Sequence, residues 1–557
     1  MILSVSQMQQ LEQSAFLRGV KPADLMKEAG YGIARVVQQF FPQSGTCIVY
    51  CGKGHNAGDA LVAARYLAKR GWKILVRLAF SKEELAPLTR LQLEKIANKI
   101  QRSKKKRNSD IKDDSFFPYS KPDPICYPLV QLDGLLGIGA CGVPTGMVAA
   151  LCEEMNQVRH KQAAFTVAVD IPSGLDGTTG LLEGACVQAD VTVTIGFVKT
   201  GLVADAATNH VGRLVVVPLL ELSAEKKIFP NGGSTNEVST NGVNGNGVLI
   251  STKANDGINE DILVCPNSNT DPVCDPICDM EVALPEKLRL LLPPRDFDVH
   301  KGIFGRVGIM AGSRGYLGAA RLASQAALHA GGGLITLYAL QENYELLARS
   351  CAPEVMVKPI KRWSDLLFEK LDALAIGPGL GSARREEILE IVEQAPWPCV
   401  LDADALNAVA KHRNLLLKCN GPRLLTPHPG EMRRLFPAEG RDRKTWATDF
   451  TNHYPVTLLL KGSRTIVAER EKPISFNTTG NPGMASGGMG DVLSGVLASF
   501  LARGIIPRDA AVLGAWLCGR AAEIAVYNGT ASEESLVASD VIDHLGSAMK
   551  GLRQGSY

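Results

Sequence analysis

The sequence lacks an uninterrupted apolar run long enough to span a bilayer. It also lacks the form of a signal peptide, because no Lys or Arg precedes Arg18 and polar residues interrupt each nearby apolar run. Its formal net charge is only +3, and no basic patch is interleaved with aromatic residues. We therefore expect a cytoplasmic protein that binds neither a membrane nor nucleic acid.

Closely spaced cysteine pairs are missing as well. The 13 cysteines are scattered along 557 residues, which is typical of a reducing compartment. Cys265, Cys274 and Cys278 form a cluster, but without a fourth ligand or a nearby histidine they do not favour a zinc site. A chain of this length is too long for one hydrophobic core and predicts two or more domains.

An alternation of strand and helix patterns appears twice along the chain. A helix is predicted over 14–39, and a surface insertion that carries the charge run 102–107 is predicted over 81–125. The first set of predicted strands covers 46–51, 73–80, 129–133, 166–170, 191–195 and 214–217. The second set covers 307–310, 334–338, 374–376, 399–401, 424–425 and 456–460. This order is typical of parallel sheets, in which ligands bind at the carboxyl ends of the strands.

Between residues 224 and 282 the composition shifts to Asn, Gly, Ser, Thr and Asp. Such a segment has too little apolar surface to offset its ordering entropy and predicts a linker. We therefore divide the chain into a first domain at 1–222, a linker at 223–284 and a second domain at 285–557.

The most informative stretch is the loop 480–490, which holds five glycines and is followed by Asp491 and a helical pattern. A glycine-rich turn at a helix N-terminus presents free N–H groups and suits phosphate. A carboxylate there would repel phosphate, so Asp491 is a candidate general base or metal anchor for a neighbouring hydroxyl. The alternative is that Asp491 only caps the helix.

Other loops with functional residue types follow strands of the second domain. His428 lies between two prolines and is a candidate substrate contact, although an isolated histidine is more often structural. A turn that starts at Lys461 is a candidate nucleotide contact, comprising Lys461, Gly462, Ser463, Arg464 and Thr465. There is no Walker A sequence, which excludes a P-loop enzyme.

Residues 286–555 resemble the NAD(P)H-hydrate dehydratases of the ribokinase-like superfamily. The motifs that carry the resemblance are 300–302, 312–319, 377–381, 402–405, 426–431, the Lys461 turn and 480–491. It implies a ribokinase-like α/β/α domain that uses ADP or ATP, with Mg²⁺, to dehydrate the S hydrate of NADH or NADPH, releasing AMP and phosphate from ADP. It also implies substrate contacts at Gly318, Gly379, His428 and Asp491, and adds Gly490 to the nucleotide site; Asp491 is the candidate catalytic base.

In the first domain, Gly52 and Gly54 are a weak signal that also suits a dinucleotide-binding loop. Asn56, Asp133 and Ser173 follow or end three predicted strands and can converge. They offer only oxygen ligands, which suits a hard cation, whereas each taken alone is more simply a loop cap.

Residues 9 to about 220 resemble the NAD(P)H-hydrate epimerase domain, a Rossmann-like three-layer α/β fold. The resemblance implies potassium at Asn56, Asp133 and Ser173, and Asp170 as acid/base in the interconversion of the R and S hydrates at C6. It implies hydrate binding by His55, Asn56, Ala57, Gly58, Asp59, Gly137, Ile138, Gly139, Ala140, Cys141, Gly142, Val143 and Asp170. The family loop reads N-N-G-G-D-G, so Ala57 adds a methyl group where the backbone approaches the ligand.

These features together predict a homo-oligomeric, bifunctional enzyme that repairs hydrated nicotinamide nucleotides with ADP or ATP as co-substrate. Two alternatives stay open: a ribokinase-like small-molecule kinase, and a first domain that binds nucleotide without catalysis.

Overall fold

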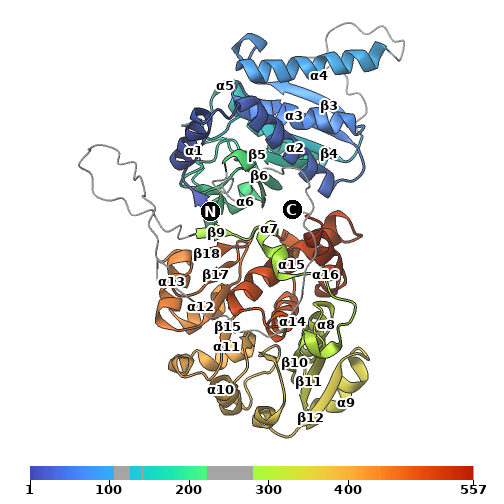
Figure 1. Ribbon diagram of the computed structural model, residues 1–557, viewed down its shortest axis with the longest axis vertical. Coiled ribbons are helices and arrows are strands. Elements are labelled where there is room, and N and C mark those ends of the chain that lie inside the picture. Colours follow the sequence, from blue (N-terminus) through green and yellow to red (C-terminus); the bar gives the residue numbers. More distant parts are fainter. Residues whose placement is uncertain (106–125, 141, 183, 223–279, 438–439, 556–557) are drawn as a thin grey trace, which may run out of the picture. The chain divides into compact units, whose positions relative to one another are not determined.

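The computed structural model describes residues 1–105, 126–140, 142–182, 184–222, 280–437 and 440–555. These residues form two α/β domains, each built on its own sheet, as the sequence predicts (Figure 1). The linker cysteines, Cys141 and most of the predicted insertion's second half lie outside the described residues.

The first domain contains a six-stranded sheet in the order β3-β2-β4-β5-β6-β8, and all its neighbouring strands are parallel. The strands are β2 (Thr46–Cys51), β3 (Lys73–Leu78), β4 (Leu129–Gly134), β5 (Phe165–Val169), β6 (Val191–Ile195) and β8 (Arg213–Val217). A separate pair joins β1 (Ile2–Leu3) and β7 (Val198–Lys199) in parallel. The strand order reverses between β2 and β4, which is where α/β sheets bind ligands.

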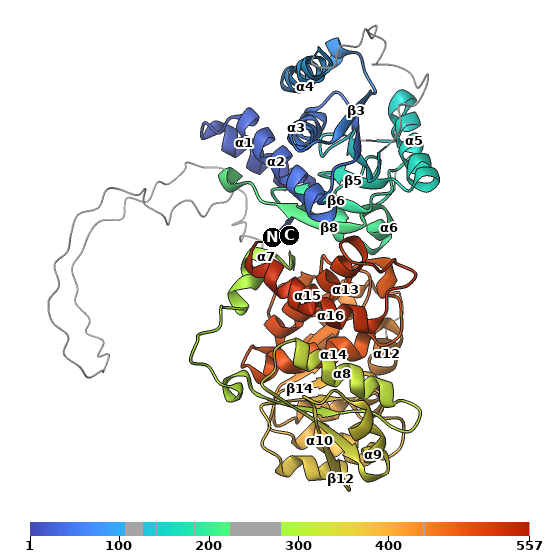
Figure 2. The same ribbon diagram turned by 90° about the vertical axis from the view of Figure 1, so that its right-hand side faces the viewer.

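Helices cover both faces of this sheet (Figure 2). They are α1 (Val5–Leu17), α2 (Pro22–Phe40), α3 (His55–Lys69), α4 (Pro87–Lys105), α5 (Gly146–Gln162) and α6 (Thr208–Val211). Alternate residues of β2 point to opposite faces, as the strand period of two requires. Val49 packs in the core with α2 and α3, whereas Ile48 and Tyr50 pack with α5.

Two sequence predictions in this domain were wrong. The single helix predicted over 14–39 is α1 and α2, because Gly19 has a left-handed φ of 89° and Pro22 begins the second helix. The segment 81–125 was expected to be a solvated insertion, but its first half contains α4. Leu93 and Ile96 of α4 are buried in the core with α3, so this half belongs to the fold.

The second domain contains a ten-stranded sheet in the order β12-β11-β10-β13-β14-β15-β16-β17-β18-β9. The strands are β9 (Met280–Val282), β10 (Arg306–Met310), β11 (Leu334–Leu340), β12 (Met356–Ile360), β13 (Ala373–Ile376), β14 (Cys399–Leu401), β15 (Arg423–Leu425), β16 (Thr457–Leu460), β17 (Ile466–Ala468) and β18 (Ile474–Phe476). From β12 to β16 every pair is parallel, so the loops that follow these strands meet at one edge.

Helices also cover both faces of the second sheet (Figure 1). They are α7 (Pro285–Leu288), α8 (Leu317–His329), α9 (Gln341–Ser350), α10 (Arg385–Gln394), α11 (Ala403–Val409), α12 (Pro429–Leu435), α13 (Arg443–His453), α14 (Met489–Ala502), α15 (Pro507–Tyr527) and α16 (Ala538–Arg553). Val400 of β14 packs on the side of α8, α14, α15 and α16, whereas its neighbour Leu401 packs on the side of α10 to α13.

Helix α15 is the one helix of the described ranges that is long and apolar enough to cross a membrane. Its most apolar 18-residue window has a mean hydropathy of 1.3, and 83% of that window is buried inside the fold. The helix contains charged residues, among them Arg520 and Glu523, so it is not an uninterrupted apolar run. The burial is typical of a core helix.

Candidate active sites

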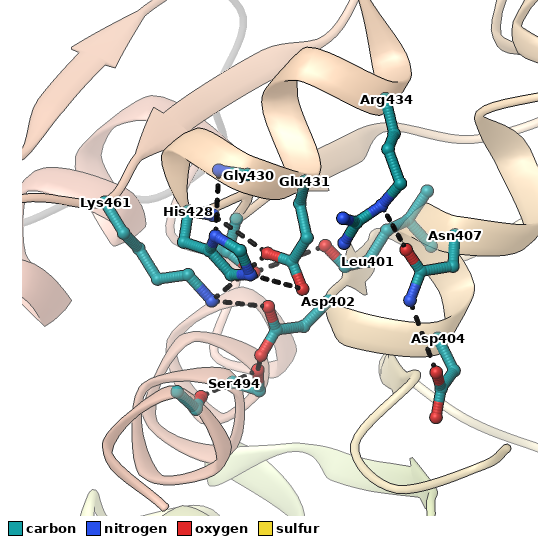
Figure 3. Close-up of polar contacts among 12 residues, drawn as sticks. Leu401, Asp402, Asp404, Asn407, His428, Gly430, Glu431, Arg434, Lys461 and Ser494 are labelled. Atoms are coloured by element: carbon teal, nitrogen blue, oxygen red, sulfur yellow. Dashed lines mark hydrogen bonds and ion pairs between the residues drawn. The ribbon is translucent and has the colours of Figure 1, made fainter. Parts of the chain in front are cut away.

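Five side chains form one connected polar network at the carboxyl edge of the second sheet (Figure 3). Asp402, directly after β14, accepts a 2.8 Å hydrogen bond from Lys461 Nζ on Oδ1 and a 2.9 Å hydrogen bond from Ser494 on Oδ2. Lys461, directly after β16, also lies 3.9 Å from Glu431 Oε2. Glu431 Oε1 lies 3.6 Å from His428 Nε2. The network therefore joins loops after three neighbouring strands to helix α14.

Lys461 stays a cation in this network. Burial by itself lowers the pKa of its ammonium group, but the charges of Asp402 and Glu431 outweigh burial, so the pKa is raised. The Lys461 side chain is 22% exposed, whereas that of Asp402 is 3% exposed. A fixed positive charge at the open edge of the site suits the phosphates of a nucleotide.

The N-terminus of α14 lies against this ion pair. A Cβ atom at Gly490 would come within 3.3 Å of both Asp402 Oδ2 and Lys461 Nζ, so the glycine permits the close approach. The cap residue of α14 is Gly488, with a left-handed φ of 89°, and Asp491 lies in the first helical turn. The alternative that Asp491 is the helix cap is therefore wrong.

The carboxyl group of Asp491 lies in surroundings that favour its protonated form. Burial raises the pKa of its carboxyl group to about 6, the negative charge of Asp402 adds to the rise, and Lys461 opposes it. Perturbed carboxyl groups of this kind are typical of catalytic sites.

His428 is held by the turn that begins α12. The ring atom Nδ1 of His428 accepts a 2.9 Å hydrogen bond from Gly430 N. The backbone N–H of His428 donates a 2.8 Å hydrogen bond to Glu431 Oε2. The imidazole is 52% exposed, whereas Glu431 is 7% exposed. This reciprocal capping fixes the backbone of His428 and leaves part of the ring free to touch a ligand.

The other predicted contacts of the second domain lie around the same edge. Gly379, with a φ of 61°, follows β13, and a Cβ atom there would meet Tyr316 and Ala319 beside Gly318. Gly462 and Ser463 are exposed and Thr465 is half-buried, whereas Arg464 is buried at 3% exposure. Arg464 thus differs from the rest of the Lys461 turn in accessibility.

In the first domain the three predicted cation ligands converge. Asp133 accepts hydrogen bonds from Ser173 N at 2.8 Å and Ser173 Oγ at 2.6 Å. Ser173 Oγ accepts from Leu136 N at 2.9 Å, and Asn56 Nδ2 donates to the carbonyl of Leu136. Burial raises the pKa of Asp133 to about 6, although the hydrogen bonds from Ser173 and Leu135 lower it.

Asp170 lies at the end of β5 in a strained backbone conformation. Its φ of 68° is left-handed, which costs a non-glycine residue about 1 kcal/mol or more and is found at functional sites. Its Oδ1 accepts hydrogen bonds from Ile195 N at 3.0 Å and from the buried ammonium group of Lys199. Asp170 itself is 7% exposed.

The predicted hydrate-binding residues occupy the first turn of α3 and the loop after β4. His55, Gly139, Ala140, Gly142 and Val143 are exposed, Asn56, Asp59, Gly137 and Ile138 are half-buried, and Ala57 and Gly58 are buried. Ala57 is 0% exposed and belongs to the core with α2. Its methyl group therefore packs inside the domain.

Sequence reasoning missed several polar and charged residues at these sites. Asp402 and Glu431 were recognised only as parts of motifs, although each follows a strand of the parallel sheet. Ser494, one turn after Asp491, was also missed. Lys199 of β7 forms an ion pair with Asp170 in the first site, and its local sequence carries no signal of this contact.

Two protein-family models match the chain. Residues 22–201 match the family described as YjeF-related protein N-terminus, and residues 307–544 match the NAD(P)H-hydrate dehydratase family. A bifunctional NAD(P)H-hydrate repair enzyme of Moorella thermoacetica is 32% identical over 99% of this chain and 97% of its own length. The repair enzyme of Escherichia coli is 30% identical over 92% of this chain and 87% of its own length.

Among solved structures, an ADP/ATP-dependent NAD(P)H-hydrate dehydratase from Bacillus subtilis, co-crystallized with ATP and Mg²⁺, is 28% identical to this chain. It aligns with 49% of this chain and 99% of its own, with a TM-score of 0.44.

The two family matches and the two sheets define a two-domain α/β enzyme. The chain belongs to the family of bifunctional NAD(P)H-hydrate repair enzymes.

Proposed function

We propose that the chain repairs hydrated nicotinamide nucleotides in two steps. The first domain interconverts the R and S hydrates of NADH and NADPH at C6. The second domain dehydrates the S hydrate with ADP or ATP as co-substrate, and releases AMP and phosphate when ADP is used. The observation that carries the proposal is the alignment with bifunctional repair enzymes over nearly the whole length of both chains.

In the second domain, Asp491 takes the proton of the C6 hydroxyl group while the nucleotide transfers a phosphoryl group to its oxygen. Elimination of phosphate then restores the dihydronicotinamide ring. The glycine-rich turn and the N-terminus of α14 receive the phosphates, and Lys461 offsets their charge. The ion pair between Lys461 and Asp402 and the raised pKa of Asp491 support these roles.

In the first domain, Asp170 is the proposed acid/base, and the loops 55–59 and 137–143 hold the hydrate. Potassium suits the oxygen-only set of Asn56, Asp133 and Ser173, where it would offset the buried charge of Asp133 and hold the loop after β4. An ion held there would connect the first turn of α3, which carries Asn56, with Asp133 of β4 and with the loop after β5, which carries Ser173.

Mg²⁺ is the proposed companion of the nucleotide. The described residues contain no group of three or more His, Cys, Asp or Glu side chains that could hold a metal by themselves. Mg²⁺ commonly uses one or two carboxylates together with substrate phosphates, and Asp402, Glu431 and Asp491 are the carboxylates beside Lys461. A cytoplasmic location and homo-oligomeric assembly stay predictions of the sequence.

The decisive experiment incubates the protein with mixed epimers of NADH hydrate and ADP or ATP, and follows the recovery of NADH and of phosphate. Complete recovery above the spontaneous epimerisation rate indicates two active domains. Recovery of the S fraction alone indicates an inert first domain. A stable phosphorylated product without NADH supports the alternative of a ribokinase-like kinase.

We expect dehydration to lose activity in acid with a midpoint set by Asp491. Its raised pKa of about 6 means that the proton-accepting carboxylate disappears below that pH. The kcat/KM for the S hydrate should therefore fall roughly tenfold for each pH unit below about 6. Initial rates between pH 4.5 and 8 check this, and a midpoint near the ordinary aspartate value of about 4 would contradict the assignment.

We expect potassium to stabilise the first domain through Asp133. Replacing KCl by tetramethylammonium chloride at equal ionic strength should lower the first-domain melting temperature by a few degrees, because a ligand that binds only the folded state stabilises it. Asp133→Asn should abolish this difference, whereas Asp176→Asn, at a half-buried position three residues after Ser173, should retain it. An equal potassium response in all three proteins would remove the cation from this site. Calorimetry makes the measurement.

A further inference from the structure

A buried lysine lies next to the proposed acid/base of the first domain. The side chain of Lys199 is only 1% exposed, and its ammonium group forms an ion pair with Asp170. Removing an ammonium group from water is costly unless the group is paired and hydrogen-bonded. Its burial at this place therefore requires partners, and the structure supplies them from Asp170 and the end of β6.

The ammonium group of Lys199 donates to three acceptors. They are Asp170 Oδ1, Thr194 Oγ1 at 3.2 Å and the carbonyl oxygen of Ile195 at 3.0 Å. A lysine side chain has three N–H donors and no acceptor, so these contacts account for all of its donors. Because Lys199 is buried and has no donor left for a ligand, it acts through the groups that it binds.

A tight bend brings Lys199 back to the end of β6. Gly196 has a left-handed φ of 72°, which glycine adopts readily, and Phe197 N donates to the carbonyl of Ile195 at 3.0 Å. Strand β7 follows immediately and pairs with β1, so that Leu3 lies opposite Lys199. The bend and the pairing together fix the backbone from which the Lys199 side chain reaches Asp170.

The two carboxylate oxygens of Asp170 differ in their contacts. Oδ1 accepts hydrogen bonds from Ile195 N at 3.0 Å, from Thr194 Oγ1 at 3.3 Å and from Lys199. Oδ2 has no hydrogen-bond partner among the described residues, and it is not one of their fully buried unpartnered atoms. The Asp170 side chain is 10% exposed. Oδ2 is therefore the oxygen that a ligand can reach.

Resting on the proposed epimerisation, we propose that Lys199 and Thr194 are positioning residues that hold Oδ1 of Asp170 against the end of β6 and thereby present Oδ2 to C6 of the hydrate. A carboxylate that is clamped at one oxygen does not rotate freely about its Cβ–Cγ bond, so its other oxygen stays in one place. Rates depend strongly on such placement of a catalytic group.

Two threonines of β6 separate this role from a merely structural one. Thr192 and Thr194 are both 0% exposed, and they lie two residues apart on one face of the strand. The Thr192 hydroxyl group donates to the carbonyl of Val211 at 2.7 Å, whereas the Thr194 hydroxyl group contacts Asp170 and Lys199. A valine at either position removes a buried hydrogen bond from the same strand, and the change at Thr194 also loosens Asp170.

The test uses the full chain and pure R hydrate without nucleotide, and follows the appearance of S hydrate by liquid chromatography after subtraction of the spontaneous rate. Thr194→Val should lower the kcat of epimerisation by about fivefold and leave the KM for the hydrate within about twofold. Thr192→Val should leave both constants within about twofold of the wild type. Equal kcat values in the two variants would overturn the role of Thr194.

Lys199→Met tests the lysine directly, because it removes all three donors and keeps an unbranched side chain of similar length. Its kcat should fall by about tenfold or more, and Lys199→Arg, which can still donate to Oδ1, should recover at least about threefold of that loss. Calorimetry of the first-domain transition shows whether each variant is folded. A smaller loss in folded Lys199→Met, or no recovery in Lys199→Arg, would overturn the role of Lys199.

The wild-type chain distinguishes a failure of this inference from a failure of the proposed function. Epimerisation by the wild type together with full activity of the Lys199 and Thr194 variants would remove only the positioning role. If Lys199→Met does not fold, the comparison of Thr194→Val with Thr192→Val decides the outcome. No epimerisation by the wild type above the spontaneous rate would overturn the proposed function, and the positioning role with it.

Discussion

Asp491→Asn is expected to lower the kcat of dehydration by about 10²- to 10⁴-fold, the usual contribution of a positioned general base. The amide keeps the shape of the carboxyl group but cannot accept the hydroxyl proton. Asp491 lies in the first turn of α14, beside Lys461 and Asp402. Nucleotide binding should be retained, because the amide also removes a negative charge that opposes phosphate.

The measurement is single-turnover recovery of NADH from S hydrate with saturating ADP or ATP. Epimerisation of R hydrate by the first domain serves as an internal control and should be unchanged. The matched variant Asp449→Asn removes an exposed carboxylate that pairs with Arg441 in the same domain, and it should leave both activities intact. Dehydration by Asp491→Asn within threefold of the wild type would exclude Asp491 from the mechanism.

The parallel sheets could be predicted because buried strands and the loops after them carry local signals. The strand 191–195 was predicted with its observed bounds. A helix was predicted to follow the glycine-rich stretch, from just after Asp491, and α14 begins slightly earlier, at Met489. Once the strands are parallel, their carboxyl ends must share an edge. This is why Lys461 and His428 could be placed near Asp491 without a structure.

The charged contacts within the two sites could not be predicted, because they depend on tertiary contacts that leave no local pattern in the sequence. Strands β1 and β7 have only two residues each, which is too short for a periodic signal, yet their pairing brings Lys199 to Asp170. The pairing of Asp402 with Lys461 joins residues 59 positions apart. Charged side chains that become buried by such contacts look like solvated residues in the sequence.

Asp402→Asn is expected to lower kcat/KM for dehydration by about 10²-fold, since misplacement of a catalytic group by about 1 Å has an effect of this size. Asp402 is the group that holds both Lys461, at 2.8 Å, and Ser494, at 2.9 Å. Without the charge of Asp402, the ion pair that remains to Lys461 is the longer one with Glu431 at 3.9 Å. The ammonium group should then no longer be fixed over the N-terminus of α14.

The pH dependence of dehydration distinguishes a loss of the Asp402 charge from general damage to the fold. After burial, the repulsion by Asp402 is the larger influence on the pKa of Asp491, and it exceeds the opposing effect of Lys461. Removing the charge of Asp402 should therefore move the acid limb of dehydration below about pH 6, although the maximal rate falls. A variant that only loosens the domain would lose rate and keep the midpoint. An unchanged midpoint, with an unfolding transition equal to that of Asp449→Asn, would show that Asp402 does not set the electrostatics of the base.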